Sequence, residues 1–310
     1  MRCAYHPDYF LPLPDGHPFP MEKFPEAHDL VKNQVDVIEI QPFPKERLTC
    51  VHDPDYLNRI NWDDEIGQSG LTHNERKRLG LPSSPRLLNR STLETSGTYY
   101  AAQWALEDGI AANLAGGTHH AFPDRGQGYC VLNDVAVTIQ LLRQDQHRCQ
   151  EMHYLVVDTD AHQGNGTNAI FQDDSYVTTF SIHVGKNYPS QKVPGDCDIE
   201  LPRWVDGETY LQAMESTLPG LFQSVEPDLV FWISGADNHE NDRFGQMKLT
   251  TENMRQRDRF ILTLCQEFHV PTTVLYGGGY NQKRGMTAAL HAQSILEAQA
   301  TPIRLATVAS

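Results

Sequence analysis

The sequence predicts an α/β protein that folds as a single domain, residues 1–310, around a mostly parallel central sheet with helices on both faces. Two observations favour this fold class. Short apolar runs alternate along the chain with helical stretches, and several of these runs are apolar on both faces, which is typical of strands buried in a parallel sheet. No low-complexity tract divides the chain, and its length suits one large domain.

Each predicted element follows from this alternation. The strands are expected at 35–40, 110–117, 152–158, 176–183, 228–235 and 272–279. The helices are expected at 95–108, 130–146, 207–224, 250–269 and 285–299. The proline-rich opening and residues 61–85 are expected to be irregular, solvent-exposed loops, although such segments can also rim a pocket.

The charge balance narrows the class of partner. The 25 Lys and Arg residues against 40 Asp and Glu residues give a formal net charge of −15. We therefore expect no binding to nucleic acid or to an anionic membrane, and a cationic partner or substrate is electrostatically easier to accept. No apolar run approaches the length of a membrane span, and the N-terminus lacks the pattern of a secretory signal. Six widely spaced cysteines without a CxxC pair indicate reduced thiols, so we expect a cytoplasmic protein.

Four of the predicted strands end in residues that carry chemistry. Thr118, His119 and His120 follow the strand at 110–117, and the stretch DTDAHQGNG begins at the end of the strand at 152–158. Asp237 follows the strand at 228–235, and Tyr280 follows the strand at 272–279. Ligands of open α/β sheets bind beyond the carboxyl ends of the strands, so these four ends can share one crevice.

The stretch VVDTDAHQGNG, residues 156–166, is the first candidate site. If the chain stays extended, Asp158, Asp160 and His162 point to one face, where a metal would offset the repulsion of the carboxylates and accept the imidazole. The alternative is a strand end whose aspartates cap the next helix. A further ligand must come from elsewhere, and Asp237 is placed to supply it, unless it is itself a helix N-cap.

Two more strand ends offer acid–base and electrophilic groups. His119 and His120 can both face one pocket on a turn, although a surface pair is the alternative. The three glycines before Tyr280 would let a loop deliver the phenol into a pocket as a hydrogen-bond donor to an oxyanion. The alternative is a flexible turn followed by an aromatic residue at the rim.

Taken together, these blocks carry a family resemblance. GGTHHAFPDRGQGYCVLND (116–134), VVDTDAHQGNGT (156–167), FSIH (180–183), SGAD (234–237) and GGGY (277–280) resemble the signature blocks of the zinc-dependent histone deacetylase family. VHDPDYL (51–57) is similar to a further block of that family. The resemblance extends over about residues 1–300 and implies the arginase/deacetylase fold. The AHQGNG and GGY forms look closest to the class IV branch.

The resemblance implies a role for each matching residue. Asp160, His162 and Asp237 would ligate a catalytic Zn²⁺, with Fe²⁺ as the alternative because two oxygen ligands select less strongly for zinc than thiolates do. His119 and His120 would form the catalytic pair. Asp158 would hydrogen-bond His119, while Asn165 stands where many members have an aspartate bonded to the second histidine. A neutral amide there should leave His120 less basic.

Two further sets of residues follow from the same resemblance. A structural K⁺ would be held by Asp158, Asp160, His162, Ser181 and Ile182, largely through backbone oxygens. The acyl-lysine channel would be walled by Tyr129, after Gly128. Tyr188 either lines the rim of this channel or is an ordinary exposed aromatic.

The chemistry expected of these residues is amide hydrolysis. An Asp–His–Asp set leaves open positions on a divalent ion, which would polarise the amide carbonyl and lower the pKa of a bound water toward about 7. His120 would take the proton of that water and later give one to the leaving amine. His119 would act electrostatically, and Tyr280 would donate to the oxyanion.

Three alternatives accompany this prediction. The substrate is an acylated lysine in a protein or peptide, or a small acylated amine such as an acylpolyamine. An arginase-like binuclear hydrolase needs a carboxylate two residues past His162, where this chain has Gly164, although His239 leaves that alternative open. The alternative outside the enzymes is a catalytically silent module that binds acyl-lysine.

Overall fold

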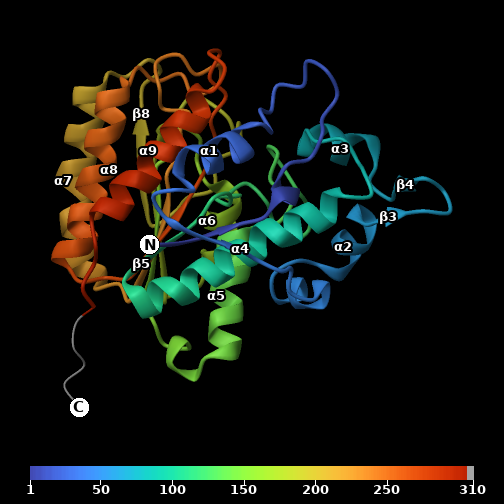
Figure 1. Ribbon diagram of the computed structural model, residues 1–310, viewed down its shortest axis with the longest axis horizontal. Helices are drawn as coiled ribbons and strands as arrows, with labels where there is room; N and C mark the ends of the chain where they lie inside the picture. The colour runs from blue at the N-terminus through green and yellow to red at the C-terminus, as the bar shows by residue number, and fades with distance from the viewer. Residues whose placement is uncertain (306–310) are drawn as a thin grey trace.

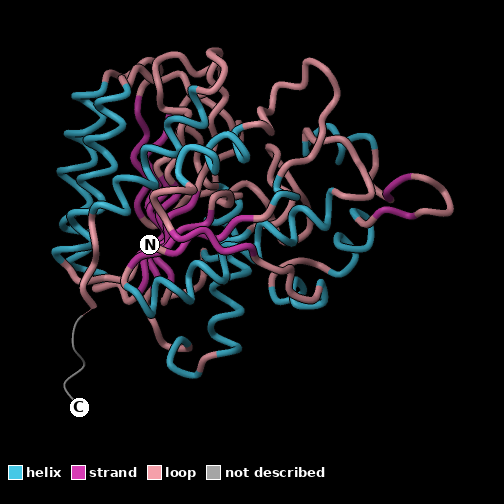
Figure 2. The backbone as a smooth tube through the Cα atoms, viewed as in Figure 1, coloured by secondary structure: helices cyan, strands magenta, loops and turns pink. Residues whose placement is uncertain are grey.

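A computed structural model describes residues 1–305 and contains an eight-stranded, entirely parallel sheet (Figure 1). The strand order is β2-β1-β5-β10-β9-β6-β7-β8. The strands are β1 (Arg2–Tyr5), β2 (Asp36–Glu39), β5 (Ile110–Asn113), β6 (Tyr154–Asp158), β7 (Val177–Val184), β8 (Cys197–Leu201), β9 (Leu229–Ile233) and β10 (Thr272–Leu275). Figure 2 shows these strands gathered in the centre of the molecule, with helices around them. The predicted α/β fold with one domain and a parallel sheet is confirmed.

The central strands are buried on both faces, which explains their continuous apolar sequences. Every residue of β5, β6, β9 and β10 is buried, including Trp232, which is fully enclosed. All six predicted strands are present, although the structure ends most of them earlier. The prediction omitted β1 and β8. These two strands lie away from the centre of the sheet, and the partly exposed edge strand β8 lacks a continuous apolar run.

Helices form a layer on each side of the sheet (Figure 1). One layer contains α1 (Lys23–Val31), α7 (Gly207–Val225), α8 (Thr251–Glu267) and α9 (Met286–Ala300). The other contains α4 (Leu87–Asp108), α5 (Asp134–Asp145) and α6 (Asn165–Phe171). The shorter helices α2 (Pro54–Ile60) and α3 (His73–Leu79) lie beyond one end of α4. Within residues 1–305 no helix combines the length and the apolar character needed to span a bilayer.

The five predicted helices are confirmed with shifted boundaries. The helix expected to start at residue 95 begins at Leu87, because its first turns are buried polar and apolar residues without a clear amphipathic signal. The helix expected to start at residue 130 begins after Asn133, whose side chain accepts a hydrogen bond from the Ala136 N–H and caps it.

The expectation of irregular, exposed segments in the opening and at 61–85 was wrong only in part. Residues 63–68 are exposed, and both segments contribute side chains to a pocket, as the alternative allowed. The opening contributes β1, a 3-10 turn (Pro7–Tyr9) and α1, and buries Tyr9 and Phe24. Residues 61–85 contain α3 and the two-stranded hairpin β3 (Trp62–Asp63) and β4 (Gln68–Ser69), which projects from the body (Figure 2). Local signals are weak here because tertiary packing, rather than periodicity, orders these short elements.

The strand order brings the chemically unusual strand ends together. β5, β10, β9 and β6 are consecutive neighbours in the sheet, and all four run in the same direction. Their carboxyl ends therefore form one continuous edge, as expected for a ligand-binding edge of an α/β sheet.

A buried arginine holds the loop after β9 in place. Arg257 of α8 is fully buried and pairs with Asp258, with Nε and Oδ1 2.8 Å apart. Its Nη1 donates to the Gly235 carbonyl and to the Asn238 side chain, both at 2.6 Å. These two residues flank Asp237, so Arg257 ties its loop to the helix layer.

Replacement of Arg257 by Leu should lower the free energy of unfolding by about 3–5 kcal/mol, because Asp258 is left buried without its counter-ion. Urea denaturation followed by circular dichroism measures this loss. Arg259→Leu on the same helix is the control. It removes an exposed ion pair with Glu297 and should change the free energy of unfolding far less, because solvent screens exposed pairs. An equal loss in the two variants would contradict the assigned role of Arg257.

Candidate active site

A buried cluster of two carboxylates and one imidazole lies at the carboxyl edge of the sheet. Asp160 and His162 follow β6, and Asp237 follows β9. One potential ligand atom from each lies within 4.8 Å of the others. His162 Nδ1 is 2.9 Å from Asp160 Oδ1 and 2.8 Å from Asp237 Oδ2. The structure therefore brings together the three residues that the sequence nominated.

Glycines allow the surrounding loops to approach this cluster. The Gly278 N–H donates to Asp160 Oδ2 at 2.5 Å, and a Cβ at Gly278 would lie 2.3 Å from Asp237 Oδ2. Only a residue without a side chain fits there.

The helix-cap interpretation of the aspartates was wrong. Helix α6 begins after Gly164 without a side-chain cap, and α8 is capped by Thr250. Asp237 Oδ1 instead accepts a hydrogen bond from the Ala161 N–H at 2.9 Å.

The cluster is suited to a divalent cation. Burial and the charge of Asp160 raise the pKa of Asp237 to about 7. Burial opposes a charge on His162, but the two carboxylates raise its pKa well above the ordinary value. Positive charge is therefore favoured at the point where the ligand atoms of Asp160, His162 and Asp237 meet. A single imidazole proton on His162 cannot bond both carboxylates equally well, whereas a cation can contact all three groups. Oxygen and imidazole donors in this arrangement match the ligands of catalytic zinc or iron sites.

The two adjacent histidines have opposite environments. His119 Nδ1 lies 2.5 Å from Asp158 Oδ2, and His120 Nδ1 lies 2.9 Å from Asn165 Oδ1. Burial disfavours the charged form of His119, but Asp158 and Asp160 outweigh it and raise its pKa to about 9. Burial and the charges of His119 and His162 hold the pKa of His120 well below its ordinary value. One ring is thus charged and the other neutral near pH 7.

The neutral ring of His120 has a defined tautomer. The Asn165 carbonyl oxygen can only accept, so Nδ1 of His120 carries the proton and Nε2 keeps its lone pair. The two rings lie with their centroids 4.1 Å apart, so both are buried at the same place rather than exposed at the surface.

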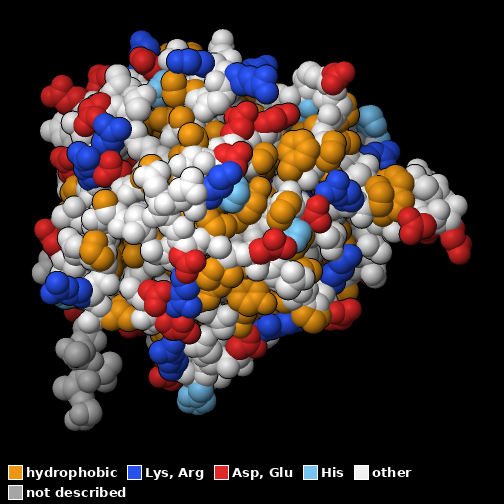
Figure 3. All heavy atoms as spheres, viewed as in Figure 1, with side chains coloured by type: hydrophobic (Ala, Val, Ile, Leu, Met, Phe, Trp, Pro, Cys, Tyr) orange, Lys and Arg blue, Asp and Glu red, His pale blue; other side chains and the backbone are white. Residues whose placement is uncertain are grey.

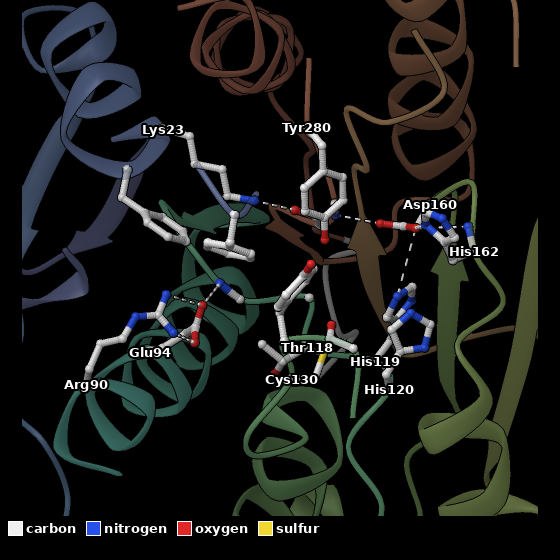
Figure 4. A pocket seen from close by; sticks show the side chains of 18 residues that line it. Lys23, Arg90, Glu94, Thr118, His119, His120, Cys130, Asp160, His162 and Tyr280 are labelled. Carbon is white, nitrogen blue, oxygen red and sulfur yellow. Dashed lines mark hydrogen bonds and ion pairs between the residues drawn. The ribbon is translucent and has the colours of Figure 1, made fainter. Parts of the chain in front are cut away.

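Tyr280 reaches the same place from the loop after β10. Its backbone N–H donates to Asp242 at 2.6 Å, and its ring packs against Tyr129 and Phe244. Burial and the charges of Asp160 and Asp237 raise the pKa of its phenol well above the ordinary value. Tyr280 is therefore a protonated hydrogen-bond donor. Figure 4 shows its hydroxyl directed into the pocket that Asp160 also borders.

Two cavities meet at this cluster. The outer cavity has a volume of about 320 Å³ and is lined by Lys77, Arg78, Leu79, Gly80, His120, Gly128, Tyr129, His162, Asn187, Tyr188, Phe244, Gln246 and Tyr280. The inner cavity has about 40 Å³, room for a few waters or a small group. It is bordered by residues such as Lys23, Glu94, Thr118, Cys130 and Tyr280 (Figure 4).

The predicted channel residues all border the outer cavity. Gly128 and Tyr129 form part of its wall, and the Tyr129 ring packs 5.2 Å from that of Phe19. Tyr188 is 39% exposed, and its ring lies 5.0 Å from the ring of His120. It therefore belongs to the wall and is not an isolated surface aromatic.

The residues nominated for potassium lie on two paired strands and the loop that follows. Asp158 of β6 pairs with Ser181 of β7, and Ile182 is the next residue of β7. Asp160 and His162 follow β6 directly, and all five residues are buried.

Residues 1–305 contain no second group of three potential ligands that would hold a further metal beside the first. A Cβ at Gly164 would lie 2.5 Å from Asp158 Oδ2, so no carboxylate side chain fits at that position. His239 instead contacts Thr251 and Asn281. Among the described residues, Asp160, His162 and Asp237 form the one group of three that could hold a metal.

The sequence did not indicate several residues that line the cavities. Lys23 of α1 is buried and donates to the Gly277 carbonyl at 2.8 Å, and burial lowers its pKa to about 8. Arg90 and Glu94 of α4 form a buried ion pair of 2.7 Å at the inner cavity. Lys77 and Arg78 border the outer cavity. No local motif marks these residues, because elements distant in sequence bring them to the site.

The parallel sheet, the buried Asp–His–Asp cluster and the flanking histidines are the arrangement expected of a hydrolase whose site can hold a divalent cation. The family follows from the sequence itself, since the model of the histone deacetylase domain matches residues 17–296. The chain therefore belongs to the histone deacetylase family, a generally metal-dependent family of hydrolases that act on amide bonds. This confirms the resemblance to the histone deacetylase family and the prediction of a hydrolase that acts on amide bonds, while the likeness to the class IV branch stays a prediction.

Curated relatives extend over most of the chain. An uncharacterized protein of Picosynechococcus sp. is 42% identical over 283 residues, which cover 89% of this chain and 91% of that protein. The acetoin utilization protein AcuC of Bacillus subtilis is 28% identical over 285 residues, covering 85% of this chain and 72% of AcuC.

Solved structures share the fold. A histone deacetylase homologue in complex with SAHA has a TM-score of 0.79 at 23% identity, covering 96% of this chain and 83% of that chain. An acetylpolyamine aminohydrolase from Burkholderia pseudomallei has a TM-score of 0.77 at 21% identity, covering 96% and 98%.

The opposite environments of the two histidines can be tested by exchanging their partners. Asp158→Asn should lower the pKa of His119, and Asn165→Asp should raise the pKa of His120, each by about 1–3 units, because a carboxylate stabilises the imidazolium. NMR titration of ¹⁵N-labelled imidazoles measures both values. Unchanged values in both variants would contradict the assigned pairs.

Proposed function

We propose that this protein is a mononuclear, metal-dependent deacylase that removes acetyl or other acyl groups from lysine side chains of a protein or peptide. The observation that carries the proposal is the convergence of Asp160, His162 and Asp237 where the outer cavity ends, beside His120 and Tyr280. A cavity of about 320 Å³ above this point suits an extended acyl-lysine side chain. We assign residues 1–310 to a single catalytic domain.

In this proposal Asp160, His162 and Asp237 hold the cation, Zn²⁺ or Fe²⁺. Bound there, the cation supplies Lewis acidity to the amide carbonyl and lowers the pKa of a water molecule toward about 7.

The two histidines divide the proton chemistry. His120, neutral and with a free Nε2, takes the proton of the attacking water and later delivers a proton to the leaving lysine amine. Asn165 orients its ring through Nδ1. His119, held in its charged form by Asp158, contributes positive charge beside the reacting groups.

Tyr280 stabilises the charge that develops on the carbonyl oxygen. Its raised pKa keeps the phenol protonated near neutral pH, so it can donate a hydrogen bond there. Gly128, Tyr129 and Tyr188 line the outer cavity. The two aromatic rings would enclose the aliphatic part of the acyl-lysine and exclude water.

A structural K⁺ is part of the same proposal. Asp158, Asp160, His162, Ser181 and Ile182 would offer it mainly backbone oxygens beside the metal cluster, where a second cation would offset the buried carboxylates. A cytoplasmic location is likewise proposed, supported by six cysteines that are all free thiols.

A small acylated amine is the second candidate substrate. The fold is shared with an acetylpolyamine aminohydrolase. A panel of acetyl-lysine peptides, longer acyl-lysine peptides and acetylated polyamines, assayed with and without a chelator, separates the two.

Replacement of Tyr280 by Phe should reduce kcat by about two to three orders of magnitude, because one donor to the oxyanion is removed. Steady-state kinetics on an acetyl-lysine peptide measures the effect. Tyr129→Phe, which also removes one phenol from the channel, should leave kcat within about threefold. Retained activity in Tyr280→Phe would exclude the proposed role.

Replacement of Asp160 by Asn should abolish both activity and metal retention, because a charged oxygen ligand is lost. Metal content after dialysis, measured by mass spectrometry, gives a readout independent of turnover. Asp158→Asn is the control, since it should retain the metal while its activity falls. Full metal occupancy in Asp160→Asn would require a different set of ligands.

A further inference from the structure

The mouth of the outer cavity carries positive charge in a chain of net charge −15. Its lining includes Lys77 and Arg78, and in the part of the chain that the structure describes it includes no Asp or Glu. Acidic and basic side chains are interspersed over the face seen in Figure 3, so the overall charge does not predict the local one. A substrate entering the cavity meets the local charge first.

The two cations of α3 are held firmly beside the channel. Helix α3 is fixed at its start by a capping box between Thr72 and Glu75. At its end, the Gly128 N–H donates to the Arg78 carbonyl at 3.1 Å, and the Tyr129 N–H donates to the Leu79 carbonyl at 2.7 Å. The segment that carries Lys77 and Arg78 is therefore bonded directly to the channel wall.

A third cation comes from a different loop. Arg243 is exposed and precedes Phe244 of the cavity wall, with its guanidinium 5.5 Å from the centre of that ring. Burial raises the pKa of Tyr129 in the channel wall, and the charge of Arg243 opposes this rise. Burial likewise raises the pKa of Tyr188, and Arg78 is among the groups that oppose it.

None of the three cations has a counter-ion within residues 1–305. Lys77, Arg78 and Arg243 take part in no ion pair there. Two carboxylates close to these cations in the sequence are already engaged. Glu75 pairs with Arg59, and Asp242 is buried and accepts from three backbone N–H groups.

Helix stability alone does not explain this arrangement. Basic residues favour the C-terminal end of a helix, which accounts for Lys77 and Arg78 at the end of α3. It does not account for Arg243 on a separate loop or for a cavity wall without carboxylates. A group of unpaired cations around a binding cavity instead indicates complementarity to an anionic partner.

We propose that the substrate of this site is an acyl-lysine flanked by acidic residues, that is, an acidic peptide segment whose carboxylates meet Lys77, Arg78 and Arg243. The proposal rests on the deacylase function proposed above and specifies its substrate class. A polyamine, or an acyl-lysine in a Lys- and Arg-rich segment, would bring like charges to this mouth. The expectation from net charge, that a cationic substrate is easier to accept, is thus replaced by its opposite at the site itself.

The test measures binding separately from turnover. Three fluorescent acetyl-lysine peptides of equal length, with Glu, Gln or Lys on both sides of the acetyl-lysine, are titrated with the metal-loaded Tyr280→Phe variant and followed by anisotropy. At low ionic strength the Glu-flanked peptide should bind about tenfold more tightly than the Lys-flanked one, and salt should reduce the difference. The same peptides are then assayed for turnover by the wild-type enzyme.

Charge reversal tests whether the cations at the mouth of the cavity cause the preference for the Glu-flanked peptide. Lys77→Glu/Arg78→Glu should invert the order of affinities and leave that of the Gln-flanked peptide within about twofold. Lys45→Glu/Arg148→Glu changes the net charge equally at exposed positions that line neither cavity, and should keep the order. Circular dichroism and thermal unfolding establish that both double variants are folded.

The outcomes separate the two proposals. The acidic-substrate proposal would be overturned by equal affinities for the three peptides or by an unchanged order of affinities in Lys77→Glu/Arg78→Glu. It would also be overturned if an acetylated polyamine bound more tightly than the Glu-flanked peptide. A clear preference for the Glu-flanked peptide without turnover by the metal-loaded wild-type enzyme would support anion recognition at the mouth of the cavity and overturn the proposed deacylase function.

Discussion

Three buried carboxylates at the carboxyl edge of the sheet, Asp158, Asp160 and Asp237, set the conditions for the rest of the site. Each is at most 3% exposed, and a buried carboxylate is costly unless positive charge or hydrogen-bond donors compensate for it. The compensation comes from His119, from His162 and from backbone N–H groups such as that of Gly278. The cation of the proposed mechanism completes it.

This constraint explains features that otherwise look unrelated. The loops that close around the carboxylates need glycine where a side chain would collide with them, as at Gly164 and Gly278. The loop of Asp237 is fixed from behind by Arg257, so that the carboxylate does not relax away from its neighbours. Burial and these charges raise the pKa of Tyr280 and keep it protonated, and the carboxylates keep His119 charged against the effect of burial. Burial, together with the charge of His119, lowers the pKa of His120 and keeps it neutral. Asn165 adds no further negative charge, which leaves His120 free to accept a proton.

The charge of the site changes along the path of a substrate. The floor is rich in carboxylates, the wall is aromatic, and the mouth carries Lys77 and Arg78 without acidic partners in the described residues. The carboxylates at the floor have local partners in His119, His162 and backbone N–H groups. The net charge of −15 is distributed elsewhere and describes solubility better than recognition.

The sequence by itself determined the alternation of strands and helices, because buried parallel strands need continuous apolar runs. It also determined which strand ends carry chemistry, because DTDAHQGNG, Asp237 and Tyr280 directly follow such runs. Only the tertiary structure decided that β5, β10, β9 and β6 are neighbours, since strand order depends on crossovers rather than on local pattern. It also placed Lys23 of α1 and Lys77 and Arg78 of α3 at the cavities. Those side chains reach the site through packing between elements far apart in the chain, and such contacts leave no periodic signal in the sequence.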